Sequence, residues 1–177
     1  MSHAIRFAIV GIVVLSFRAS PQAERTSAAP RVRSENPVLA AAIARGNEQS
    51  LTFKRLIADI DATDGLVYVA EGPCGQGVRA CLHMTVDLAG PFRMLRVFVN
   101  SRRAPGCELI GSIGHELQHA IEALGNPGVR SGFALVSFFR LLGPEGTMRF
   151  ETPEAIAAGV AVEKETCGRD SRTLRAD

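Results

Sequence analysis

The sequence predicts an α+β fold in which a small antiparallel or mixed sheet is followed by a central helix and two further helices. Three observations predict it. Apolar residues recur at helical spacing both before and after a middle region in which apolar and polar residues alternate. Breaks that contain glycine or proline separate these segments. The chain has 177 residues, 46 % of them hydrophobic, which suits one globular domain with its own core.

The N-terminus has the features of a targeting segment. Arg6 precedes an apolar run over residues 7–17, which has the length of a signal-peptide core and is too short to span a membrane comfortably. We therefore expect residues 1–23 to be a signal peptide, with an uncleaved N-terminal anchor or a buried helix as the alternatives. Residues 24–36 are rich in alanine, serine, proline and charge, so we expect a flexible linker there. The folded domain is then expected over residues 37–177.

Two helices are expected to open this domain. The first covers residues 37–44. The second covers residues 51–62, with Ser50 as its N-cap. Its apolar side consists of Leu51, Phe53, Leu56, Ile57 and Ile60.

Three strands are expected next, over residues 66–71, 81–88 and 93–100. The third strand alternates most clearly, because Leu95, Val97 and Val99 share one face. Gly90-Pro91 separates the last two strands, which predicts that they form an antiparallel hairpin.

The central helix carries the pentapeptide His115-Glu116-Leu117-Gln118-His119, which is an H-E-x-x-H motif. Helical spacing of apolar residues surrounds it, at Ile110, Ile113, Leu117, Ala120, Ile121 and Leu124. Gly125-Asn126-Pro127 ends the helix, whereas its beginning, near Cys107 or Ser112, is not sharply marked. Two more helices are expected, over residues 129–142, ended by Gly143-Pro144, and from Thr152 to about Thr166 with Pro153 in its first turn.

This motif points to zinc chemistry. Two histidines four residues apart lie one turn apart on the same side of a helix, so both imidazoles can bind one Zn²⁺ ion. Glu116 lies between them and can act as general base on a zinc-bound water. A polar edge of an ordinary amphipathic helix is the alternative interpretation of His115 and His119.

A catalytic zinc usually has three protein ligands, so two histidines leave one to be found. Glu122 faces the same side as the histidines but lies about 10.5 Å along the axis from His115, at about 1.5 Å per residue. Such a spread along one straight helix suits a partner of the histidines, or a surface charge, better than a ligand. A carboxylate from the last helix remains, and Glu151 and Glu154 are the candidates at its start.

The segment from Gly114 to Glu122, followed by Phe150-Glu151-Thr152, resembles a group of small, exported, uncharacterised bacterial zincin-like proteins. The resemblance covers roughly residues 50–165 and implies a gluzincin-type metallopeptidase, in which a later helix supplies the third zinc ligand. It favours Glu151 over Glu154. The extended motif of the metzincins is excluded, because Glu122 and Gly125 stand where that motif has glycine and histidine. The resemblance also implies a sheet strand that borders the cleft and pairs with an extended substrate.

Charge and cysteine content bear on partners and compartment. Arg6 and Arg18 account for the formal net charge of +2, and no basic patch suited to nucleic acid is present. The four cysteines agree with export to an oxidising compartment. Pairs Cys74–Cys81 and Cys107–Cys167 are one of the three connectivities that four cysteines allow, and unpaired core thiols are the alternative.

Together these features predict an exported zinc-dependent hydrolase, and we expect a peptidase that acts on a peptide or protein substrate. His115, His119 and Glu151 are the predicted ligands of Zn²⁺, and Glu116 is the predicted general base. The alternative is a non-catalytic zincin-like domain that serves the cell envelope by binding metal or by its structure. The motif does not separate a peptidase from another amidase that uses the same metal chemistry.

Overall fold

The computed structural model describes residues 29–75, 77–103, 106–142 and 150–173. In chain order the elements are β1 (Val32–Arg33), α1 (Pro37–Gln49), α2 (Leu51–Asp61), β2 (Gly65–Glu71), β3 (Ala80–Leu82), β4 (Asp87–Ala89), β5 (Phe92–Val99), the 3-10 turn η1 (Ser101–Arg103), α3 (Cys107–Leu124), α4 (Gly132–Leu142) and α5 (Pro153–Thr173). The α+β class is therefore confirmed. The expected signal segment 1–23, residues 24–28 of the expected linker and the break at residues 143–144 lie outside the described residues.

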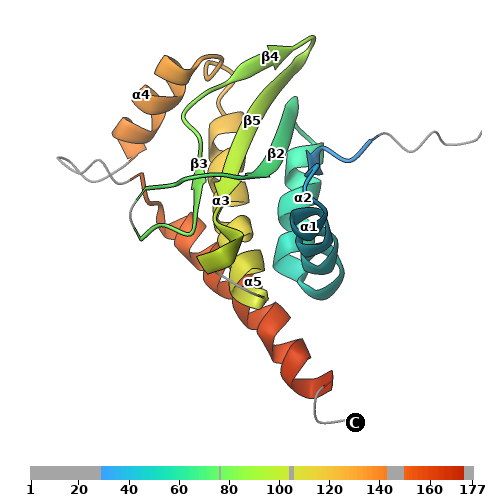
Figure 1. Cartoon of the computed structure of the whole chain (residues 1–177). Coiled ribbons are helices and arrows are strands. Elements are labelled where there is room, and N and C mark those ends of the chain that lie inside the picture. The colour runs from blue at the N-terminus through green and yellow to red at the C-terminus, as the bar shows by residue number, and fades with distance from the viewer. Residues whose placement is uncertain (1–28, 76, 104–105, 143–149, 174–177) are drawn as a thin grey trace, which may run out of the picture.

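The sheet is mixed, one of the two forms that the sequence left open. Its order among the described strands is β1-β2-β5-β3, and β4 also pairs with β5 (Figure 1). β1, β2 and β5 run parallel, in a register that sets Val67 beside Leu95 and Val69 beside Val97. β3 and β4 run antiparallel to β5, which confirms the hairpin expected at Gly90. Gly90 has a φ of 61°, a left-handed conformation that glycine adopts freely.

Two expectations about strands need correction. The single strand expected over residues 81–88 is two short strands, because the backbone turns between them, where the Thr85 N–H donates to the His83 carbonyl. The expected linker is not wholly irregular either. Within its described part, Val32 is 3 % exposed and pairs with Val67, so the chain joins the sheet before α1 begins.

One face of the sheet forms the core with the helices. Val67 and Val69 of β2 are buried there, and so are Leu95, Val97 and Val99 of β5, as the alternation along the third expected strand predicted. α3 lies behind β5, and α1 and α2 lie together beside β2 (Figure 1). The sheet and these helices therefore cover one side of α3 and leave the side with Gly111, Gly114 and His115 toward α5.

Arg93 shares the buried face of β5 because it stands two residues before Leu95. Its guanidinium is 4 % exposed and donates to both carboxylate oxygens of Asp64. It also donates to the carbonyls of Leu124, Asn126 and Val129, just where α3 ends. One buried cation thus satisfies carbonyls at the end of the motif helix and fixes that end to the sheet.

The helix boundaries differ from expectation at several ends. α1 continues to Gln49 rather than stopping near residue 44, because Gly46 lies inside the helix and packs closely against Phe53 and Ile110. α4 begins at Gly132 rather than at residue 129, and the Ser131 hydroxyl accepts the Ala134 N–H at its start. α5 extends to Thr173, beyond the predicted end near Thr166.

α3 and α5 pack closely along their length. A Cβ atom built on Gly111 would lie 2.7 Å from Glu163 Cβ, and one on Gly159 would lie 3.0 Å from His115 Cβ. Only a hydrogen fits in the place of these side chains. The disulfide Cys107–Cys167 joins the start of α3 to α5, and Cys74–Cys81 joins the loop after β2 to β3, so both expected pairs are confirmed.

No helix within the described ranges combines the length and apolar character needed to cross a membrane.

Candidate metal centre

The motif residues leave α3 on the side that faces α5 and the edge of the sheet. His119 and Glu116 are buried, at 5 % and 7 % exposure, whereas the His115 side chain is 21 % exposed. The rings of His115 and His119 have centroids 4.9 Å apart, as expected for residues one turn apart. His119 is further held by the ring of Phe139, which meets it edge-on with centroids 5.4 Å apart.

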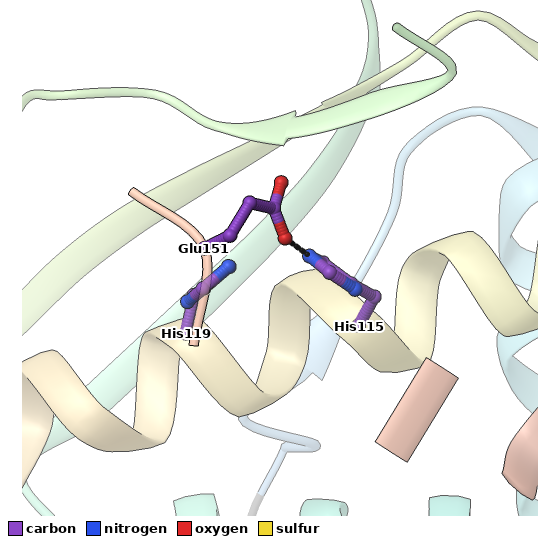
Figure 2. A group of neighbouring side chains, drawn as sticks. All are labelled: His115, His119 and Glu151. Carbon is purple, nitrogen blue, oxygen red and sulfur yellow. Dashed lines mark ion pairs between the residues drawn. The ribbon is translucent and has the colours of Figure 1, made fainter. Parts of the chain in front are cut away.

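Glu151 lies two residues before the start of α5, and its side chain reaches this pair of histidines. Figure 2 shows its carboxylate extending over the two rings from a separate segment of the chain. Glu151 Oε2 lies 3.1 Å from His115 Nε2. Donor atoms of His115, His119 and Glu151 all lie within 4.8 Å of one another. The structure thus brings together the three residues that were predicted as ligands, whereas Glu154 is exposed and outside this group.

Glu122 sits behind His119, not in the group. Its Oε2 lies 3.0 Å from His119 Nδ1, and its other oxygen accepts a hydrogen bond from Thr152. With Nδ1 engaged by the carboxylate, Nε2 is the nitrogen of His119 left to bind a metal. The role expected for Glu122, a partner of the histidines, agrees with this geometry.

Thr152 links α3 to the start of α5, and the sequence reasoning missed it. Its hydroxyl donates to Glu122 Oε1 at 2.7 Å and accepts the Ala155 N–H at 3.1 Å, so it also caps α5. Its side chain is buried and follows Glu151 directly. The signal available was a threonine just before Pro153 at a helix start, which predicts a cap but not its second partner.

Glu116 is held by the edge strand of the sheet. Its Oε2 accepts the backbone N–H of Leu82, in β3, at 2.7 Å. Burial raises the pKa of Glu116 to about 7, and the nearby His119 and the Leu82 N–H oppose that rise. Glu116 is therefore a buried carboxyl next to the cluster with a fixed orientation, which suits a group that accepts and returns protons.

The charges around the two histidines are mostly negative. Burial and the neighbouring His119 lower the pKa of His115, although Glu151 opposes this effect. Burial also lowers the pKa of His119, but the hydrogen bond with Glu122 and the nearby carboxylates outweigh it, and the net shift is upward. Three carboxylates surround two imidazoles, so the centre favours a cation.

The donor set fits zinc. Two imidazole nitrogens and one carboxylate are ligands that Zn²⁺ takes in catalytic sites. Ligands about 2.1 Å from a tetrahedral ion lie roughly 3.4 Å from one another, and the atoms of this cluster span 3.1 Å to within 4.8 Å. The orientation of His119 by Glu122 adds the outer partner that metal-binding histidines usually have.

In comparisons with protein-family models, with curated proteins and with solved structures, nothing matched the chain.

Proposed function

We propose that the protein is a zinc-dependent hydrolase of the zincin-like, gluzincin type, and that it acts as a peptidase. The convergence of His115, His119 and Glu151 beside the buried carboxyl of Glu116 carries this proposal. A structural zinc site takes all four of its ligands from the chain, so it needs no further buried acid next to the ion. Here the three proposed ligands and Glu116 line two cavities, which share Glu116 and Glu151.

Each residue has a defined part. His115, His119 and Glu151 would hold the ion, and Glu122 keeps His119 in the tautomer that presents Nε2. When bound, zinc supplies Lewis-acid chemistry, which polarises a carbonyl and lowers the pKa of a coordinated water. Glu116 accepts a proton at its carboxylate and passes it to the leaving amine. The Leu82 N–H keeps that carboxylate in place through both transfers.

Export fits this proposal. The two disulfides are compatible with an oxidising compartment outside the cytoplasm, and we propose that residues 1–23 direct the chain there. An N-terminal membrane anchor is the alternative that the same segment allows.

Metal binding is tested first. We expect the purified, oxidised protein to hold one zinc per chain, measured by elemental analysis after dialysis against zinc. His115→Ala and His119→Ala are expected to lose it, and Glu151→Gln to bind it more weakly. His83→Ala is the matched control, because His83 is exposed and packs on Phe98 away from the cluster. Full zinc occupancy in His115→Ala or His119→Ala would overturn the ligand assignment.

Hydrolysis is tested on the zinc-loaded protein with denatured polypeptides, and new termini are read by mass spectrometry. Glu116→Gln is expected to keep zinc and to lose cleavage by about 100-fold or more, because general acid–base groups contribute about 10²–10⁴-fold. Equal cleavage by this variant would end the mechanism. A wild-type protein that binds zinc tightly but cleaves no polypeptide would favour the non-catalytic alternative instead.

A further inference from the structure

α4 has an outward face that the described part of the fold does not cover. Of its 11 residues only Leu135 and Phe139 are buried, and they attach the helix to the rest of the protein. Figure 1 shows α4 at one side of the molecule, apart from α1, α2 and α5. Phe133 is 84 % exposed and Leu141 is 87 % exposed, the two highest values among the large apolar side chains of the described residues. α4 therefore presents to solvent side chains that a helix of a globular protein normally turns inward.

The exposed apolar side chains share this face with an arginine. Phe133, Ser137, Arg140 and Leu141 stand at positions i, i+4, i+7 and i+8, which lie on one side of an α-helix. Arg140 is exposed and belongs to the last turn of the helix. The outward face, defined by these four residues, is thus apolar and cationic at once.

The charge of this region has one sign. Residues 125–142 contain two arginines, Arg130 and Arg140, and no aspartate or glutamate. The Arg130 side chain is half exposed and reaches Asp64 only at 3.9 Å, so its charge stays accessible to solvent. A matching partner combines an apolar interior with negative groups at its surface, and a bilayer that contains anionic lipids has both.

The size of the outward face favours a lipid surface over a second protein. A helix of 11 residues extends about 16 Å and is about 10 Å wide. Each partner in a stable protein complex buries about 800 Å², several times what such a face offers. A second copy of the chain is disfavoured further, because a symmetric contact through this face brings the two copies of Arg140 together, and α4 has no acid to pair with them.

We propose that α4 is an interfacial helix that docks the protein on an anionic membrane surface. Phe133 and Leu141 enter the boundary between headgroups and acyl chains, where the burial of apolar area favours binding. The alkyl part of Arg140 lies along this boundary, and its guanidinium donates hydrogen bonds to lipid phosphates. The helix is too short to cross the bilayer, so it lies in the plane of the surface. Docking of this kind requires neither hydrolase activity nor a bound metal.

The inner face of α4 connects the outward face to the candidate metal centre. The ring of Phe139 meets the ring of His119 with centroids 5.4 Å apart. Phe139 also lines the cavity of about 690 Å³ beside His119. Because a helix is about 10 Å across, docking through the outward face holds this cavity close to the lipid headgroups.

A fluorophore on α4 tests the docking in the full chain. The four cysteines form the two disulfides, so an introduced cysteine is the thiol that takes the label. Ser137→Cys places an environment-sensitive dye between Phe133 and Leu141, and Ala40→Cys places the same dye at an exposed position of α1 as the control. Vesicles of equal parts phosphatidylcholine and phosphatidylglycerol should shift the emission of the dye on α4 to shorter wavelength and leave the dye on α1 unchanged.

Variants of the outward face give the magnitude. In the chain labelled at residue 137, Phe133→Ser should raise the lipid concentration for a half-maximal shift by about tenfold, because a large apolar side chain no longer enters the boundary. Arg140→Gln should raise it by about fivefold, the factor that one arginine contributes near an anionic surface. Leu51→Ser is the matched control, because Leu51 is 68 % exposed on α2, and it should change nothing. Circular dichroism verifies that each variant is folded.

Several results would overturn the proposal. One is the absence of a shift on anionic vesicles, and another is an equal shift on phosphatidylcholine alone. An equal shift of the dye on α1 would mean that the N-terminal segment, and not α4, brings the chain to lipid. Half-maximal lipid concentrations that are the same for Phe133→Ser, Arg140→Gln and the parent chain would refute the outward face as the contact. A shift that needs no lipid and grows with protein concentration would identify a second copy of the chain as the occupant.

Discussion

Replacement of Thr152 by valine removes one hydroxyl that acts on two helices, and its effects on stability and on metal affinity can be separated. The hydroxyl caps α5 through the Ala155 N–H and supports Glu122, which orients His119. Loss of a cap costs about 1 kcal/mol. Loss of a hydrogen bond to a carboxylate costs about 1.5–3 kcal/mol, toward the lower end here because part of the Glu122 side chain meets water. The free energy of unfolding of the metal-free protein is therefore expected to fall by about 2–3 kcal/mol.

Zinc affinity is expected to fall as well, by about tenfold. Mutation of a residue that hydrogen-bonds a metal-binding histidine lowers metal affinity by about 10–100-fold. Thr152 is one hydrogen bond further from the histidine, because it acts through Glu122, so we expect an effect at the lower end of this range. Urea unfolding measures the stability, and competition with a chelator measures the zinc Kd. Thr152→Ser keeps the hydroxyl and should restore both. Asn36→Ala removes the cap of α1, far from the cluster, and should lower stability by about 1 kcal/mol with an unchanged zinc Kd. A zinc Kd for Thr152→Val within about twofold of wild type would show that Thr152 is a cap only.

Three more predictions concern residues that position the helices and the sheet around the proposed metal site. Gly159→Val should push α5 away from His115, lower the free energy of unfolding by about 1–3 kcal/mol and weaken zinc binding. Gly168→Ala is the control, because a Cβ there meets nothing within 4 Å, and urea unfolding and zinc titration should show no change. Arg93→Met should lower the unfolding free energy by about 3 kcal/mol, because it leaves the partly exposed carboxylate of Asp64 and the carbonyls at the end of α3 without their cation. Arg96→Met, at a partly exposed arginine, should cost under about 1 kcal/mol, and equal losses in urea would contradict the buried role of Arg93. Burial raises the pKa of Glu165, but hydrogen bonds from Ser50 and Thr52 outweigh this effect and lower the pKa overall. The ionised carboxylate therefore stabilises the fold at pH values above the pKa of glutamate in the unfolded chain, about 4.3, and this stabilisation is lost as the pH falls through the lower pKa of the folded state. Glu165→Gln should therefore destabilise the protein at pH 7 and progressively less below about pH 4; a pH-independent difference in urea midpoint would contradict this linkage.

The parts of the fold that follow from local pattern could be predicted from the sequence. The alternation at Leu95, Val97 and Val99 identified the buried face of β5, and the spacing of His115 and His119 placed both rings on one side of α3. In each case one element's own geometry decides where the side chains point.

The parts that depend on distant segments could not be predicted in this way. The same alternation that buries Leu95 also buries Arg93, but only the tertiary structure supplies the carboxylate and carbonyls that make a buried arginine tolerable. The bond between Glu116 and the Leu82 N–H joins residues 34 apart in the chain. The strand at Val32 lies in a segment of polar and small residues, and it forms because β2 offers a free edge beside it.

The disulfide Cys107–Cys167 has a consequence for how such a protein can change over evolution. It joins two cysteines 60 positions apart, one at the start of α3, which carries His115 and His119, and one in α5, which begins just after Glu151. α4 and Phe150 lie within this stretch, and Phe139 and Phe150 line the cavity beside His119. Covalent closure holds the two helices together whatever connects them, because a longer loop adds only a little entropy. On the proposed function, residues 125–149 can therefore change in length and in side chains, and the substrate with them, while α3 and α5 keep their positions relative to each other.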